Sequence, residues 1–146
     1  MMQLDCQITR SFHDEHLNTI ALLERIDAEL TKHKLNAVPE QSDNEINKLL
    51  GDICVLVDSE LNTHFGFEED SLFPLLIAAG DGGIAELLTD EHQTILPLGE
   101  RLREIARKGK ASGFNKESWN EFRQLGKELI ERLTSHIQKE EMGLLP

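Results

Sequence analysis

The chain has 146 residues and a net charge of −12, and its composition is 39% hydrophobic and 29% charged. This length suits one hydrophobic core, so we expect residues 1–146 to form a single domain. The acidic charge argues against nucleic acid or an anionic membrane as a partner, and the absence of a long apolar run or a signal-peptide pattern predicts a soluble, cytoplasmic protein.

Helical periodicity dominates the sequence, and strand patterns are almost absent. We expect four helices, at about residues 12–34, 43–73, 84–108 and 116–146, with the second ending near Phe73 or a little past Pro74. The breaks between them contain Pro39, the glycine-rich segment AAGDGG, and Asn115 as an N-cap, while Ser42 with Glu45 predicts a capping box. Four helices joined by short breaks predict an all-α fold, an antiparallel up-down-up-down four-helix bundle, rather than a looser helical array.

Two segments of the sequence share one pattern. HFGFEEDSLFP at 64–74 and HIQKEEMGLLP at 136–146 both read H-x-x-x-E-E-x-x-L-x-P, and DEH occurs at 14–16 and again at 90–92. Each long segment places a glutamate four residues after a histidine, one helical turn along the same face. The next glutamate, Glu69 or Glu141, lies about 140° around the helix, so we expect these two side chains to face solvent.

Six polar side chains are expected to meet in the core at one end of the bundle. On helical wheels, four histidines continue apolar stripes, and two glutamates point the same way. In an antiparallel bundle, the starts of the first and third helices lie beside the ends of the second and fourth, which places all six at similar depth. The candidate ligands are His16, His64, Glu68, His92, His136 and Glu140.

Buried carboxylates are costly unless they are paired or bind a metal, and no lysine or arginine shares these stripes. A pair of divalent cations would balance both carboxylates, with imidazole nitrogens as further ligands. This ligand set suits iron, and manganese or zinc can also fit. Six protein ligands leave open positions on two octahedral ions. The alternative is a set of hydrogen-bonded core residues in an interaction bundle that binds no metal.

The pattern resembles that of the hemerythrin-like, or HHE cation-binding, family, whose members carry H … H-x-x-x-E … H … H-x-x-x-E on a four-helix bundle. The resemblance runs from about residue 9 to Pro146, and all six candidate ligands match it. It implies a non-heme centre of two iron ions (Fe2+/Fe3+), bridged by both glutamates and by an oxo or hydroxo group. Under this interpretation, each repeated segment belongs to one half of the site.

One position departs from the oxygen-carrying members of that family. They place a second histidine on the third helix as H-x-x-x-H, whereas Leu88 and Leu96 lie four residues before and after His92. Because one histidine ligand of the oxygen carriers is missing, we do not expect reversible oxygen transport. We expect instead a metal centre with more open positions. His13, one turn before His16, is a candidate for a further ligand, although we favour an exposed side chain near a helix start.

Other residues near the expected centre receive simpler interpretations. Glu60, one turn before His64, is either a partner of a ligand histidine or a solvated glutamate. Glu15 and Glu91 lie in first helical turns, where they would complement the helix dipoles. Three aromatic side chains are expected to screen the centre from water: Phe65, Phe67 and Phe73.

The sequence therefore predicts a di-iron protein that binds dioxygen, nitric oxide or peroxide at an open metal position, in sensing, scavenging or iron handling. The alternatives are an iron donor for iron–sulfur cluster repair and an oxygen-activating di-iron enzyme. Ferritin-like enzymes use E-x-x-H spacing, and no histidine here has a glutamate three residues before it. Whether the protein is an enzyme stays open at this point.

Overall fold

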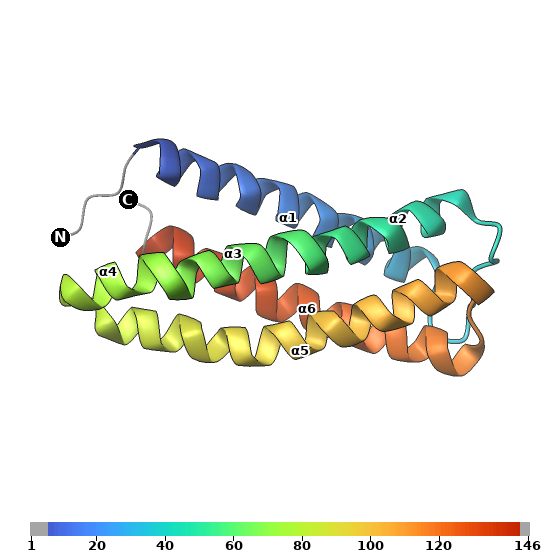
Figure 1. Ribbon diagram of the computed structural model, residues 1–146. Helices are drawn as coiled ribbons and strands as arrows, with labels where there is room; N and C mark the ends of the chain where they lie inside the picture. The colour runs from blue at the N-terminus through green and yellow to red at the C-terminus, as the bar shows by residue number, and fades with distance from the viewer. Residues whose placement is uncertain (1–5, 144–146) are drawn as a thin grey trace.

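The computed structural model describes residues 6–143, and it consists of four long helical rods (Figure 1). Three rods are single α-helices: α1 (Cys6–Lys32), α5 (Gly82–Ser112) and α6 (Lys116–Gly143). The second rod is continuous but changes its winding along its length, as α2 (Asn44–Val55), η1 (Leu56–Leu61), α3 (Asn62–Phe67), η2 (Glu68–Leu72) and α4 (Phe73–Ala78). The described part of the chain contains no β-strand.

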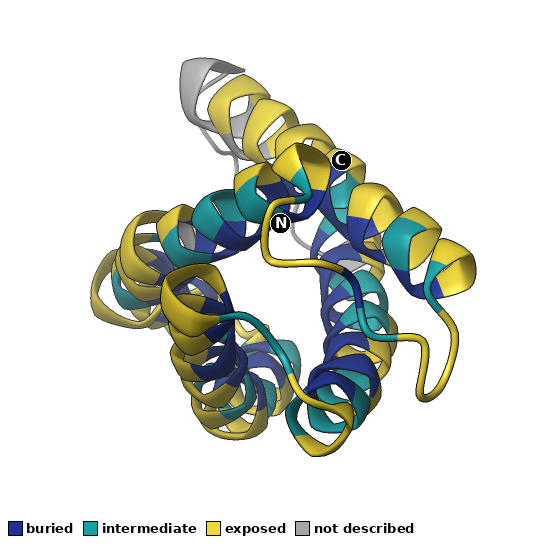
Figure 2. Cartoon of the chain, turned by 90° about the vertical axis from the view of Figure 1, so that its right-hand side faces the viewer, coloured by how far each residue is buried: buried dark blue, intermediate teal, exposed yellow. Residues whose placement is uncertain are grey.

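The four rods are arranged as an antiparallel bundle. Helix α1 contacts α2 and α6, and α5 contacts α2 and α6, so each rod has two neighbours. The start of α1, the end of α4, the start of α5 and the end of α6 therefore share one end of the molecule (Figure 1). The buried faces of all four rods point toward the central axis (Figure 2). The predicted all-α four-helix bundle is confirmed.

The first two rods begin differently from the sequence prediction. Helix α1 starts at Cys6 rather than near residue 12, because neither glycine nor proline interrupts the preceding residues. Helix α2 is capped by Asp43 and not by Ser42. The Asp43 carboxylate accepts hydrogen bonds from the backbone N–H groups of Glu45 at 3.0 Å and Ile46 at 3.1 Å. This N-cap satisfies two of the donors that every helix start leaves open.

The turns between the later rods follow the expected chemistry. Gly80 and Gly113 adopt φ values of 94° and 79°, in the left-handed region that favours glycine. Asn115 caps α6, because its side-chain oxygen accepts a hydrogen bond from the Ser118 N–H at 2.8 Å. The predicted N-cap at Asn115 is thereby confirmed.

The second rod continues through Pro74 to Ala78, and so favours the later of the two predicted ends, near Phe73 or a little past Pro74. Proline donates no backbone hydrogen bond, which normally disrupts a helix. Here the rod widens just before it: the Phe73 N–H bonds to the Glu68 carbonyl, five residues back. The Asn62 N–H makes a similar bond to the Val57 carbonyl at the end of η1. Single π-turns of this kind are frequent at functional sites, and these two flank His64.

Two apolar clusters hold the bundle together. The larger one runs along the axis and includes Trp119 and Phe122, whose rings stack at 5.3 Å at the end where α6 begins. The smaller one joins η2, α4 and α5 near the opposite end, through Leu72, Phe73 and Leu88. In residues 6–143, no helix combines the length and the apolar character that a membrane crossing requires.

Candidate metal centre

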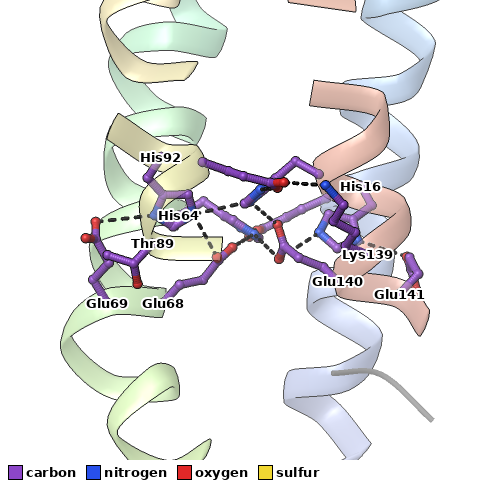
Figure 3. A network of polar contacts seen from close by, with 12 residues as sticks. His16, His64, Glu68, Glu69, Thr89, His92, Lys139, Glu140 and Glu141 are labelled. Atoms are coloured by element: carbon purple, nitrogen blue, oxygen red, sulfur yellow. Dashed lines mark hydrogen bonds and ion pairs between the residues drawn. The ribbon is translucent and has the colours of Figure 1, made fainter. Parts of the chain in front are cut away.

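The six candidate ligands lie together in the half of the bundle where α4 ends. Figure 3 shows His16, His64, Glu68, His92 and Glu140 converging between the helices. They come from all four rods: His16 from α1, His64 and Glu68 from the second rod, His92 from α5, and His136 with Glu140 from α6. The Glu68 and Glu140 side chains are 0% and 1% exposed. Only His64 is half-buried rather than buried. The side chains converge as the helical wheels predicted.

The ligand atoms form two groups of three, each with all its atoms within 4.8 Å of one another. The first group, here called the A triad, comprises His16, His64 and Glu140. The second group, the B triad, comprises Glu68, His92 and His136. Two histidines and one carboxylate in each group match the ligand chemistry of a first-row transition metal.

Each glutamate spans the two triads. Glu68 places one carboxylate oxygen 2.6 Å from His64 Nε2 and the other 3.2 Å from His92 Nε2. Glu140 lies 2.7 Å from His136 Nε2 and 3.5 Å from His16 Nε2. The repeated segments therefore do not form two self-contained half-sites, because each glutamate also serves the histidines of the other repeat.

The inner carboxylates fit a cation better than a hydrogen-bond network. All four oxygens of Glu68 and Glu140 are buried, and none has a partner with hydrogen-bond geometry. Unsatisfied buried acceptors are rare because each costs free energy. His92 Nε2 also lies only 3.2 Å from His136 Nε2, so at most one of these atoms can hold a proton between them. A cation coordinated by these oxygens and nitrogens would satisfy the whole set.

Protonated imidazoles provide the alternative counter-charge in the metal-free protein. Burial by itself would lower the pKa of His64, but the carboxylates of Glu140 and Glu68 outweigh it and raise the pKa to about 10. The pKa values of His16 and His136 are raised in the same way against burial, chiefly by Glu140. Burial would raise the pKa of Glu140, but the neighbouring imidazoles hold it well below its ordinary value. Protons and metal therefore compete for the same atoms.

Four further glutamates contact the outer nitrogens of the same histidines. Glu15 lies 2.5 Å from His64 Nδ1, Glu91 2.8 Å from His136 Nδ1, and Glu141 2.9 Å from His16 Nδ1, each with hydrogen-bond geometry. Glu69 lies 3.3 Å from His92 Nδ1 as a looser ion pair (Figure 3). We call Glu15, Glu69, Glu91 and Glu141 the outer glutamates.

These contacts correct two sequence predictions. Glu141 was expected to face solvent, but it is only 30% exposed and reaches His16 on α1. Glu69 is exposed as predicted, but it also reaches His92 on α5. Glu15 and Glu91 were expected to act on helix dipoles, but they contact ligand histidines. The sequence did contain a sign of these four glutamates, because the tripeptide DEH and the pair E-E each occur twice, once in each half of the chain.

Two basic side chains, His13 and Lys139, lie outside this layer. His13 is 54% exposed and contacts Glu141 at 3.0 Å, so it belongs to neither triad and matches the favoured interpretation of an exposed histidine. Lys139 forms an ion pair with Glu91. Burial would raise the pKa values of Glu91 and Glu141, but Lys139 and His136 lower the pKa of Glu91, and His16 and His13 lower the pKa of Glu141. The Glu60 side chain lies outside the described part of the chain.

Aromatic rings cover the B triad on one side. Phe65 stacks on His92 with a centroid distance of 3.8 Å and an interplanar angle of 5°. Phe73 lies 5.6 Å from the same imidazole. The screening role expected for these two residues agrees with their burial. The same expectation for Phe67 is wrong, because that side chain is 43% exposed.

A small cavity of about 20 Å³ adjoins the A triad. A cavity needs roughly 10–15 Å³ of this kind of volume to hold one water molecule, so the space accommodates one molecule of about that size. Its apolar walls are Leu61, Phe65, Leu133 and Ile137, and the Thr19 side chain also lines it. The A triad therefore has an adjoining space of the size of a small ligand.

The fold and the site define a class of protein: an antiparallel helical bundle with a histidine and carboxylate centre for cations at one end. The family model of the hemerythrin HHE cation binding domain matches residues 7–146, so the chain belongs to this family. Neither the curated proteins nor the solved structures gave a match. Domains of this family bind metal cations, and the A and B triads are the groups in the described residues that can hold them.

Proposed function

We propose that the chain holds two iron ions, one at the A triad and one at the B triad. We further propose that it binds dioxygen, nitric oxide or peroxide beside the A triad, in sensing, scavenging or iron handling. The cavity next to His16 and His64 is the observation that carries this proposal. Iron is favoured by the mixed imidazole and carboxylate ligands, while manganese and zinc fit the same donors. Bound iron would supply one-electron chemistry toward the small ligand.

The residues around the cavity determine what can enter it. Leu61, Leu133 and Ile137 present apolar walls, which favour an uncharged diatomic molecule over a hydrated ion. Phe65 separates the cavity from the stacked face of His92. Because rings cover the B triad and space adjoins the A triad, the two metal positions are expected to differ in access to ligands.

The ligand count favours an open centre over a reversible carrier. Each triad supplies three protein groups, and neither Leu88 nor Leu96 can add a donor on α5. Their side chains pack in the apolar clusters. Glu68 and Glu140, the inner glutamates, each lie within reach of both triads, and they would balance part of the charge of the two cations.

The first experiment tests whether a small ligand reaches the iron. Anaerobic iron-loaded protein is exposed to dioxygen and, separately, to nitric oxide, while the visible absorption spectrum is recorded. The proposal predicts a new absorption band with at least one of the two gases. An iron protein that stays colourless and unreactive toward both would contradict it.

A cavity-filling variant tests the position of the ligand. Leu133→Phe adds a ring where Leu133 lines the cavity, and we expect it to retain iron but to lose the gas-dependent band. Leu129→Phe is the matched control, since Leu129 is buried one turn earlier on α6 and does not line the cavity. Equal gas responses in the two variants would argue against binding beside the A triad.

A further inference from the structure

The outer glutamates are distributed around the bundle in a closed cycle. Glu15 on α1 reaches His64 on the second rod, and Glu69 on the second rod reaches His92 on α5. Glu91 on α5 reaches His136 on α6, and Glu141 on α6 returns to His16 on α1. Each rod thus contributes one outer glutamate, and each outer glutamate contacts a histidine of the next rod.

The cycle accounts for every glutamate that the repeated segments share beyond Glu68 and Glu140. In both DEH tripeptides, the glutamate immediately before the histidine is an outer glutamate. In both E-E pairs, the first glutamate lies in the centre and the second is an outer glutamate. The aspartates of the tripeptides, Asp14 and Asp90, are exposed.

The chemistry of imidazole explains how an outer glutamate can prepare a histidine to bind a metal. A neutral imidazole carries one proton, and an acceptor at Nδ1 keeps that proton on Nδ1, which leaves the Nε2 lone pair for a metal. All four Nε2 atoms face Glu68 or Glu140, at distances between 2.6 and 3.5 Å. Each imidazole is therefore held between an inner and an outer carboxylate.

The contacts between the outer glutamates and the histidines differ from ordinary ion pairs on a protein surface. Exposed carboxylates usually pair with lysine or arginine, and such pairs contribute little stability. Here three of the four outer glutamates make hydrogen bonds to histidine side chains that are themselves 0–11% exposed. Partners of buried ligand histidines commonly fix the ring orientation and the tautomer.

We infer that Glu15, Glu69, Glu91 and Glu141 are positioning residues that fix the four imidazoles with Nε2 toward the cations. The inference rests on the proposed metal centre, but not on the identity of its small ligand. It predicts a division by triad: Glu15 and Glu141 hold the A triad histidines, and Glu69 and Glu91 hold those of the B triad.

The test uses the full chain with Zn²⁺ as a diamagnetic probe. Zn²⁺ affinity is measured by competition with a chromophoric chelator for wild type, Glu141→Ala, Glu141→Gln, Glu91→Ala and Glu91→Gln. The alanine variants should bind Zn²⁺ about 10–100-fold more weakly, and the glutamine variants should bind it with intermediate affinity, since the amide oxygen can still accept from Nδ1–H. The charge-matched controls Asp14→Ala and Asp90→Ala should bind Zn²⁺ as wild type does.

A spectroscopic readout separates positioning from general destabilisation. In ¹⁵N NMR of Zn²⁺-loaded protein, each ligand imidazole should show Nδ1–H with slow solvent exchange. Glu141→Ala should lose that protection at His16 alone, and Glu91→Ala at His136 alone, on the neighbouring helix in each case. Wild-type affinity and protection in both alanine variants would overturn the inference while leaving the metal centre intact. Failure of wild type to bind Zn²⁺ would overturn both.

Discussion

Glu68 and Glu140 are the residues on which the centre depends most. Both carboxylates are buried, both lack hydrogen-bond donors with proper geometry, and each reaches histidines of both triads. Removing either one would take away an anionic ligand from each metal position. Loss of a ligand matters more here than loss of packing, because the cations need the carboxylate charge.

At this scale we predict that Glu68→Ala and Glu140→Ala each purify with less metal than wild type. Elemental analysis after dialysis measures the change. Suitable controls are Asp70→Ala and Glu131→Ala, which replace exposed acids on the same rods. Glu69 and Glu141 are unsuitable as controls, because they contact ligand histidines. Full metal content in both inner variants would show that the six residues are not the ligands.

The raised pKa of His64 predicts opposite effects of pH on the metal-free and the metal-bound protein. Its pKa is about 10 in the folded metal-free protein against an ordinary 6.5, so its stabilising contribution is complete below pH 6.5 and is lost as pH rises through about 10. Metal affinity should rise over that range, since the proton on His64 competes with the cation.

Urea unfolding of metal-free protein at several pH values between 6.5 and about 10 measures the first effect. The free energy of unfolding should fall with pH, and the slope should be shallower in His64→Gln. Chelator competition with Zn²⁺ over the same range measures the second effect. Metal affinity that does not change with pH, or an identical slope in His64→Gln, would contradict the assignment.

At the scale of elements, helical periodicity explains which parts of the site could be read from the sequence. The six inner side chains continue apolar stripes, so one helix at a time determines their direction. The outer glutamates lie far from those stripes, and their contacts depend on which helix is the neighbour. A wheel drawn for Glu141 alone cannot show that α1 places His16 2.9 Å away.

Helix ends show a similar limit. Local rules left the end of the second rod at Phe73 or a little past Pro74, and the bond from the Phe73 N–H to the Glu68 carbonyl accompanies the continuation of the rod into α4. Widening a helix in this way depends on tertiary packing, here on Phe73 and Leu72 in the smaller apolar cluster. The glycine turns were predictable because Gly80 and Gly113 need positive φ values, which is a local property.

Two glycines inside helices should respond in opposite ways to alanine. An added Cβ at Gly66 meets no atom within 4 Å, so Gly66→Ala should stabilise the protein by about 0.5–1 kcal/mol through helix propensity. At Gly109 the Cβ would lie 2.6 Å from Phe114 Cε2, so Gly109→Ala should destabilise it by about 1 kcal/mol. Urea unfolding measures both changes. Stabilisation by Gly109→Ala would show that the Phe114 ring moves freely.

At the scale of the whole molecule, the larger apolar cluster runs along the axis of the bundle and extends well beyond the metal centre. Trp119 and Phe122 are fully buried at the end opposite the two triads. The larger apolar cluster also contributes residues from all four rods. The bundle should therefore stay folded without metal. The four rods would lose only the cations that their side chains coordinate jointly.

Metal removal should accordingly lower stability without unfolding the protein. A metal that binds only the folded state at about 100 times its Kd stabilises it by about 2.7 kcal/mol, and a chelator should remove that contribution. Circular dichroism should keep its helical signal at room temperature. Fluorescence of Trp119, the one tryptophan of the chain, should stay that of a buried indole. A loss of helical signal on chelation would show that the core depends on the metal.

The most direct measurement is the metal content of the full chain purified from iron-replete cells without added metal, recorded together with its visible spectrum. Two triads predict two iron ions per chain and an absorption band that changes on exposure to dioxygen or nitric oxide. Glu140→Ala, prepared in parallel, should show less iron and lose that band. Wild-type protein that is folded by circular dichroism but contains no transition metal would contradict the account.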